Sequence, residues 1–353
     1  MPDDTAGRRV SLAMIVRDEA RSITRCLDSV RDLVDEMVVV DTGSVDNTPE
    51  LAAAAGARVH HFTWVDDFAA ARNAALDLCD GEWRLVLDAD EWVVAGAETL
   101  AGLRLAEPTF AGMVRVESPT DAGTTEQSWQ ERLLPADVRY TGRVHEQPVH
   151  DLPRRRLDLR LAHDGYLGVQ LERKAGRNRL LLEKALSETP DDAYLHYQLG
   201  KDHEAAGQFG AACASYAEAY ALNGPTGPRT PAWQHALVTR YVYCLGEDGR
   251  TEEAIDIADA ELPHWQNSAD FWFGLGNLLL KHALANPAAA EGLLPLIESS
   301  WQRCLELGDN LHLPGSVVGR GSHLAARNLV VFYESQGRGA EADRYRALAE
   351  PPA

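Results

Sequence analysis

Residues 83–91, WRLVLDADE, decide how the first half of this chain folds. The apolar run at 83–87 is typical of a short strand that is buried on both faces of a sheet. Three acids follow it directly, at Asp88, Asp90 and Glu91. Alternate residues of an extended segment point to the same side, so we expect Asp88 and Asp90 to face one cavity. Such paired carboxylates suit Mg²⁺ or Mn²⁺, which in turn bind a diphosphate; a solvated turn is the alternative.

Three further strand-like segments precede this one, and helix-like segments separate them. We expect the four strands at residues 10–16, 37–40, 58–64 and 83–87. Helical patterns lie between them, at residues 18–36, 48–56 and 68–79. This regular alternation predicts an α/β domain with a Rossmann-like, mostly parallel sheet and right-handed crossovers. Ligands of such sheets bind beyond the carboxyl ends of the strands.

Polar residues follow the earlier strands at those same ends. Asp41 ends the second strand, where a carboxylate can accept hydrogen bonds from a nucleobase or a ribose. The alternative is an Asx turn that leads into Gly43. Arg72, on the third helix, is suited to bidentate binding of a phosphate, or else it lies on the solvent face. The same two roles are open for Arg17, directly after the first strand.

The second half of the chain has a different pattern, because strand-like runs disappear and Ala and Leu dominate. Residues 194–224 match the 34-residue tetratricopeptide pattern, in which small residues let two antiparallel helices pack closely. Weaker echoes follow at Gly249 with Ala254, at Gly276, and at Gly337 with Ala342. A plain helical bundle is the alternative.

The middle of the chain, residues 95–160, is the least regular part. Strands are expected at residues 113–117, 132–134 and 144–149, and a polar loop at 118–127. The run of three arginines at 154–156 reads as a solvated turn rather than a binding site.

Composition excludes several classes of protein. The chain has 353 residues, of which 45% are hydrophobic and 25% charged, as in ordinary globular proteins. Its net charge of −20 opposes non-specific binding to nucleic acid or to an anionic membrane. No apolar run reaches the ~18 residues of a membrane span, and the N-terminus lacks a signal peptide's apolar stretch. The 5 cysteines form no CxxC pair, which indicates a reducing compartment, so we expect a cytoplasmic location.

Seven motifs, in order, make the chain similar to a known family. They are SLAMIVRDEARSITRCLDSV (11–30), VVVDTGSVDNT (38–48), WVDDFAAARNAAL (64–76), GEWRLVLDADEW (81–92), YTGRVHEQ (140–147), AHDGY (162–166) and KAGRNRLLL (174–182). Together they resemble glycosyltransferase family 2. The most similar subgroup joins a GT-A catalytic domain to C-terminal tetratricopeptide (TPR) repeats and includes the S-glycosyltransferases of peptide antibiotics.

The resemblance implies a role for individual residues. Asp90 would ligate the metal together with His163, and Asp88 would face the ribose. Glu146 falls at the position of the catalytic base, although its neighbour His145 is a second candidate. The residues implied for the nucleotide-sugar site are Val16, Arg17, Glu19, Asp41, Gly43, Arg72, Asp88, Ala89 and Gly142.

The expected organisation is a disordered tail at 1–9, a GT-A domain at 10–168 and a TPR-like α-helical domain at 169–350. The implied activity is metal-dependent, inverting transfer of a sugar from a nucleoside-diphosphate-sugar, with a UDP-sugar as the expected donor and Mn²⁺ or Mg²⁺ as cofactor. The acceptor is a peptide, a saccharide or a natural product, and the helical domain is expected to hold a peptide acceptor, a partner chain or a second copy of the protein. Two rival functions are a TPR scaffold with a non-catalytic first domain and a sugar-1-phosphate nucleotidyltransferase.

Overall fold

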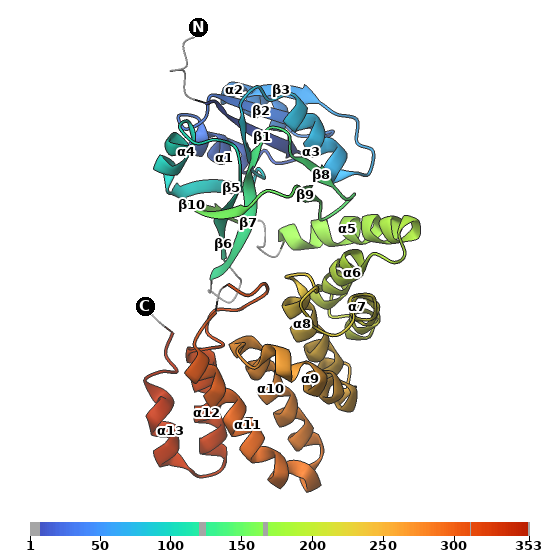
Figure 1. Ribbon diagram of the computed structural model, residues 1–353, viewed down its shortest axis with the longest axis vertical. Coiled ribbons are helices and arrows are strands. Elements are labelled where there is room, and N and C mark those ends of the chain that lie inside the picture. The colour runs from blue at the N-terminus through green and yellow to red at the C-terminus, as the bar shows by residue number, and fades with distance from the viewer. Residues whose placement is uncertain (1–7, 120–124, 165–168, 311, 352–353) are drawn as a thin grey trace. The chain divides into compact units, whose positions relative to one another are not determined.

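The computed structural model describes residues 8–119, 125–164, 169–310 and 312–351 (Figure 1). The chain divides into two compact units, Met1–Ala185 and Leu186–Ala353. Strands lie only in the first unit among the described residues, and the second is helical, which confirms the predicted fold class. The units divide within helix α5 (Val169–Glu188), whereas the expected boundary was where that helix begins.

Residues 1–7 of the expected tail lie outside the described residues. Residues 8 and 9, the last two of the expected tail, are held by hydrogen bonds from their backbone amides. The amide of Arg8 donates to the carbonyl of Arg104 at 2.9 Å, and the amide of Arg9 donates to Glu82 at 2.7 Å.

An eight-stranded sheet forms the first unit, in the order β3-β2-β1-β4-β7-β6-β10-β5. Its strands are β1 (Val10–Val16), β2 (Glu36–Asp41), β3 (Arg58–His61), β4 (Trp83–Val86), β5 (Glu91–Ala95), β6 (Ala111–Pro119), β7 (Thr125–Pro135) and β10 (Arg154–His163). A separate hairpin pairs β8 (Arg139–Thr141) with β9 (Gln147–Val149). The first four strands in the chain run parallel, as predicted, while β7 pairs antiparallel to both β4 and β6.

Two expectations for the middle of the chain are wrong. The segment expected as a polar loop at 118–127 contains the end of β6 and the start of β7; its residues 120–124 are outside the described part. The arginine run at 154–156 opens strand β10 and is not a turn. A strand signal was present, since Leu157, Leu159 and Leu161 alternate with polar residues and the last two are 0% exposed.

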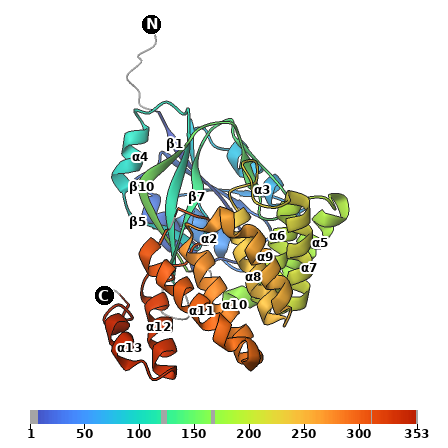
Figure 2. The same cartoon turned by 60° about the horizontal axis from the view of Figure 1, so that its bottom comes forward.

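Helices cover both faces of the parallel strands (Figures 1 and 2). On one face, α1 (Ile23–Val30) and α4 (Ala97–Leu103) share a core with Leu12 and Met14 of β1. On the other face, α3 (Phe68–Asp77) packs its alanines against Ala13 of β1 and its neighbours. Small side chains let α3 lie close to the sheet, and this closeness brings Arg72 to the strand ends. The remaining helix of this unit among the described residues, apart from α5, is α2 (Thr48–Ala54).

The second unit consists of helix pairs. Its helices are α6 (Ala193–Ala205), α7 (Phe209–Asn223), α8 (Gln234–Glu247), α9 (Thr251–Trp265), α10 (Ala269–Ala285), α11 (Pro287–Leu307), α12 (His323–Ser335) and α13 (Gly339–Arg346). Three turns between paired helices contain a glycine at positive φ, with a fully buried alanine five residues later. These pairs are Gly207 with Ala212, Gly249 with Ala254, and Gly337 with Ala342. The predicted repeat signals therefore mark true helix–turn–helix units.

Close packing of helix pairs depends on particular glycines. A Cβ placed on Gly276 of α10 would lie 2.6 Å from Nε1 of Trp301, which is 1% exposed, whereas one on Gly274 would meet nothing within 4 Å. We expect Gly276→Ala to destabilise the protein by about 1–3 kcal/mol, because the buried indole must move. In the same helix, Gly274→Ala should be neutral or stabilising by up to about 1 kcal/mol. Urea denaturation of both variants checks this, and equal effects would contradict it.

All five cysteines are free and buried. Within the part of the chain that the structure describes, no helix combines the length and the apolar composition of a membrane span.

Candidate active site

The acidic segment after β4 is a tight turn. The amide of Glu91 donates to the carbonyl of Asp88 at 3.0 Å, and the amide of Asp88 donates to Oε2 of Glu91 at 3.0 Å. The expectation of an extended segment is therefore wrong. The chain has to reverse here, because β4 ends at Val86 and β5 begins at Glu91 on the far edge of the sheet. As a result, Asp88 and Asp90 meet different partners, with the buried Ala89 between them.

Two arginines hold the carboxylate of Asp88. The Nη2 atom of Arg72 lies 2.8 Å from Oδ1, and that of Arg132 lies 2.8 Å from Oδ2. Both arginines are buried, at 9% and 8% exposure, while the Asp88 side chain is 35% exposed. Burial alone would raise the pKa of Asp88, but the two guanidinium groups outweigh it and lower that pKa well below its ordinary value.

Arg132 is a site residue that the sequence analysis missed. It lies on β7 and also donates to Oε1 of Glu91 at 2.5 Å. Burial raises the pKa of Glu91, and the charge of Asp88 adds to this rise, while Arg132 opposes it. The sequence did contain a signal for this residue. Arg132 is a charged residue inside a segment expected as a strand, next to Leu133 and Leu134. The partner of that charge, however, follows only from the pairing of β7 with β4.

Asp90 faces His163 at the end of β10. Oδ2 of Asp90 lies 3.5 Å from Nε2 of His163, and the other ring nitrogen, Nδ1, lies 3.0 Å from the hydroxyl of Ser118. Burial lowers the pKa of His163, but the hydrogen bond to Asp90 and the surrounding carboxylates outweigh it and raise that pKa above its ordinary value. The contact with Ser118 orients the ring, as an outer partner of a metal-binding histidine does.

This pair fits a divalent cation. Two ligand atoms bound to one ion at about 2.1 Å lie roughly 3.0–3.5 Å apart, and the observed separation is 3.5 Å. Across the described residues, no group of three or more His, Cys, Asp or Glu side chains gathers as a metal cage. Asp90 and His163 therefore suit a cation that takes its remaining ligands from phosphate oxygens and water, which is typical of Mg²⁺ with a nucleotide.

The loop between β8 and β9 carries the candidate base. It begins at Gly142, whose φ of 97° few other residues adopt, and it ends at Glu146. Asn73 of α3 fastens β8 with two hydrogen bonds to the backbone of Tyr140, at 2.9 and 2.8 Å. The carboxylate of Glu146 accepts a hydrogen bond from Nε of Arg72. One helix thus positions both the loop and the Glu146 side chain.

The second candidate base, His145, directly precedes Glu146. Its φ of 52° places it in the left-handed region, which is uncommon for a residue with a side chain. Its backbone carbonyl accepts a hydrogen bond from the side-chain Nε2 of Gln147 at 3.1 Å. Of the two candidate bases, Glu146 is the one with a hydrogen bond to Arg72 given above.

The ends of β1 and β2 form the third part of the site. Asp41 is 3% exposed and accepts hydrogen bonds from the amides of Gly43 and Ser44, at 3.1 and 3.2 Å. The Asx turn left open by the sequence is therefore present. Asp41 ends β2, which is separated from β4 by β1 alone. Two interstrand spacings amount to about 10 Å. This distance is comparable with the span from a nucleobase to its phosphates.

The three remaining candidates lie at the end of β1. Val16 is buried, and its carbonyl accepts a hydrogen bond from the amide of Thr42 at 2.9 Å. The Arg17 side chain is 46% exposed, and Glu19 accepts a hydrogen bond from the Ser22 hydroxyl at 2.9 Å. Direct contacts thus join Arg72, Asp88 and Glu146 in one cluster and Asp90 and His163 in another.

Residues 11–145 match the family described as Glycosyl transferase family 2. A TPR repeat-containing protein of Synechococcus elongatus is 34% identical over 307 residues, which are 80% of this chain and 75% of that protein. The SPbeta prophage-derived glycosyltransferase SunS of Bacillus subtilis is 26% identical over 205 residues, which are 55% of this chain and 49% of SunS. The chain thus spans about half the length of SunS.

Solved structures were also compared. Glucosyl-3-phosphoglycerate synthase of Mycobacterium tuberculosis, in complex with Mn²⁺, UDP and product, is 26% identical over 32% of this chain and 45% of that chain, with a TM-score of 0.27. A structure of MamA is 16% identical over 51% of this chain and 91% of that chain, with a TM-score of 0.38. Both TM-scores are too low for these matches to bear on function.

The family match covers residues 11–145, which include the motifs at the ends of the parallel strands. The chain is a glycosyltransferase in which residues 11–145 belong to a domain of glycosyltransferase family 2, and a TPR-like helical region follows that domain.

Proposed function

We propose that this chain transfers a sugar from a nucleoside-diphosphate-sugar, with a UDP-sugar as first candidate, to a nucleophilic acceptor with inversion at the anomeric carbon. The observation that carries the proposal is the acidic turn. It presents Asp90 to His163 on one side and Asp88 to two buried arginines on the other. Asp90 and His163 would hold Mn²⁺ or Mg²⁺, which when bound supplies Lewis-acid stabilisation of the departing diphosphate.

The chain's own residues would carry out the remaining chemistry. Arg72 lies between Asp88 and Glu146, so its guanidinium holds the Glu146 carboxylate in a set orientation. The acceptor oxygen or sulfur attacks the anomeric carbon while the bond from that carbon to the diphosphate breaks. Glu146 takes the proton of the attacking O–H or S–H group as general base. Asp41 would accept hydrogen bonds from the base at the other end of the donor.

Among the rivals, the nucleotidyltransferase has the least support. That chemistry uses a glycine-rich loop after the first strand to bind phosphates. Here β1 ends at Val16 and continues as Arg17-Asp18-Glu19, without a glycine.

We further propose that the helical region binds the acceptor, with a peptide as first candidate. Stacked helix pairs form extended surfaces suited to peptides. A second copy of the chain is the other candidate partner for these helices.

A donor screen tests the proposed activity. Purified protein is incubated with each common nucleoside-diphosphate-sugar and Mn²⁺ or Mg²⁺, without acceptor, and free nucleotide is measured. We expect slow hydrolysis of one donor, lost on addition of EDTA. Titration with UDP, with and without Mn²⁺, is the companion measurement. If UDP binding were absent or independent of the cation, and no donor were hydrolysed, the non-catalytic scaffold would be the better account.

A further inference from the structure

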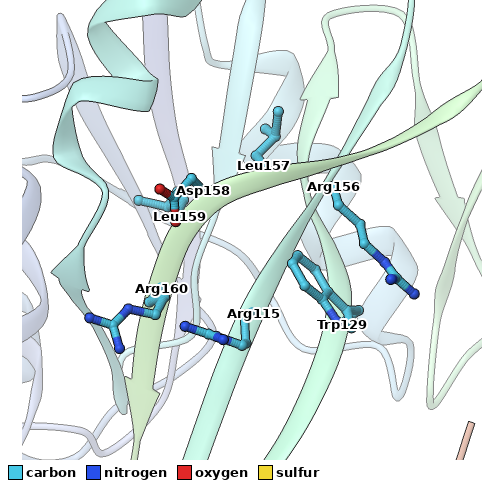
Figure 3. Close-up of a pocket in the computed structure, with 7 residues that line it drawn as sticks. All are labelled: Arg115, Trp129, Arg156, Leu157, Asp158, Leu159 and Arg160. Carbon is cyan, nitrogen blue, oxygen red and sulfur yellow. The ribbon is translucent and has the colours of Figure 1, made fainter. Parts of the chain in front are cut away.

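A cavity of about 230 Å³ lies on strands β6, β7 and β10 (Figure 3). Three of the residues that line it are arginines: Arg115 on β6, and Arg156 and Arg160 on β10. Trp129 of β7 and Asp158 also line it. None of the candidate active-site residues belongs to this lining. Three guanidinium groups around one cavity are unusual in a chain whose net charge is −20.

The strand register builds this cavity. Arg115 pairs with Trp129 of β7 on one side and with Arg160 of β10 on the other, so these three side chains project from the same face of the sheet. The register of β10 against β6 shifts between Arg156 and Arg160, which makes room beside β6. In Figure 3 the side chains of Arg115 and Trp129 lie below the bulged part of β10.

Two of these guanidinium groups, those of Arg115 and Arg160, share a single carboxylate oxygen at long distances. Nε of Arg115 is buried and has no hydrogen-bond partner among the described residues. Its nearest carboxylate oxygen, Oε1 of Glu117, lies 3.3 Å away, and the same oxygen lies 3.7 Å from Nη1 of Arg160. One carboxylate is therefore shared by two guanidinium groups at distances longer than a charge-assisted hydrogen bond.

An aromatic surface completes the cavity. The guanidinium of Arg156 lies 4.9 Å from the centroid of the Trp129 ring. Such stacking holds a guanidinium in place beside the cavity. Arginine forks match the geometry of phosphate, sulfate and carboxylate groups, each of which accepts paired hydrogen bonds.

The cavity lies on the same face of the sheet as α3, the helix whose Arg72 contacts Glu146. Ala111 of β6 shares a core with α3, and Arg115, four residues further along the strand, points to that same face. Along β7, Trp129 is three residues from Arg132, which corresponds to about 10 Å.

We propose that this arginine cavity binds an oxyanionic group of the acceptor, a phosphate, sulfate or carboxylate. The assignment of the anion to the acceptor rests on the proposed glycosyltransferase reaction. Binding of an anion in the cavity can be tested without turnover.

Inorganic phosphate is the first probe. Calorimetric titration at constant ionic strength should give saturable binding with a dissociation constant of about 1 mM. The double variant Arg115→Gln/Arg160→Gln should weaken it at least ~10-fold. The control Arg31→Gln/Arg303→Gln removes the same charge from a residue directly after α1 and from one on α11, whose side chains are 49% and 39% exposed, and should leave binding unchanged. No saturable binding, or equal loss in both double variants, would overturn the site.

Glu117→Gln supplies a gain-of-binding test. It removes the carboxylate that Arg115 and Arg160 share, so phosphate should bind more tightly, by ~3–10-fold. A merely structural role of these arginines predicts no such gain, and weaker or unchanged binding in this variant would contradict the proposal.

Paired acceptors test the link to the reaction. Two model acceptors that differ by one anionic group, such as glycerol and glycerol 3-phosphate, are each assayed with the donor found in the screen. Their kcat/KM values are then compared. We expect higher kcat/KM for anionic members, and loss of this preference in Arg115→Gln/Arg160→Gln. Equal use of both members, or no transfer to any anionic member while the wild-type protein hydrolyses donor, would overturn the acceptor assignment. Absence of donor hydrolysis in the wild-type protein would instead count against the proposed function.

Discussion

Asp90→Asn should abolish cation-dependent donor turnover, with kcat/KM falling by ~10²–10³-fold or more. The side chain is 6% exposed and lies 3.5 Å from His163, so the charge is lost at a buried position beside the second expected ligand. Asparagine keeps the shape and one oxygen of aspartate but has no negative charge. The affinity for Mn²⁺ should fall together with the turnover, and titration followed by electron paramagnetic resonance measures it directly.

The matched control for this variant is Asp80→Asn. Asp80 lies just before β4, at the other end of that strand, and its side chain is 61% exposed. It should leave both Mn²⁺ affinity and turnover unchanged. Full activity of Asp90→Asn, or full wild-type activity in the presence of EDTA, would exclude the role given to Asp90.

Glu146→Gln should lower kcat by ~10²–10⁴-fold while leaving the affinity for UDP intact, because glutamine cannot take up the acceptor proton. The change also removes a carboxylate from the buried Arg72, although Asp88 remains 2.8 Å from that guanidinium. The melting temperature and the UDP affinity therefore have to be measured beside kcat, so that a folding defect is not mistaken for lost catalysis.

Two further variants complete this experiment. Glu50→Gln, at an exposed position in the first turn of α2, is the control and should keep the wild-type kcat. His145→Gln separates the two candidate bases. If His145→Gln lowered kcat by ~10²–10⁴-fold while Glu146→Gln did not, the proton acceptor would be His145.

The parallel half of the sheet follows closely from local sequence. Strand β1 begins and ends at the residues expected, and the other three parallel strands lie within three residues of theirs. Strands β1, β2 and β4 are buried on both faces, so continuous apolar runs mark them. Strand β10 was missed because its exposed arginines hid an alternating pattern, and β8, with 3 residues, is too short to carry a pattern of its own.

Some residues of the candidate site could likewise be predicted from the sequence, and others could not. The acids at Asp41, Asp88 and Asp90 were predictable, since parallel strands that follow one another in the chain end at the same edge of a sheet. Arg132 and Ser118 were not, because they lie on β7 and β6, and only the antiparallel pairing of these strands brings them to the acids. The direction in which Asp88 points also depended on the turn that leads to β5.

The sequence by itself determined the order of elements, the class of each unit and the edge of the sheet at which the acidic groups gather. Periodicity and strand-end position are local properties of a chain, and so they can be read from it directly. Only the tertiary structure decided which charges neutralise one another, and that Arg115, Trp129 and Arg160 line one cavity. The physical reason is that the register between strands distant in sequence is selected by the packing of the whole sheet.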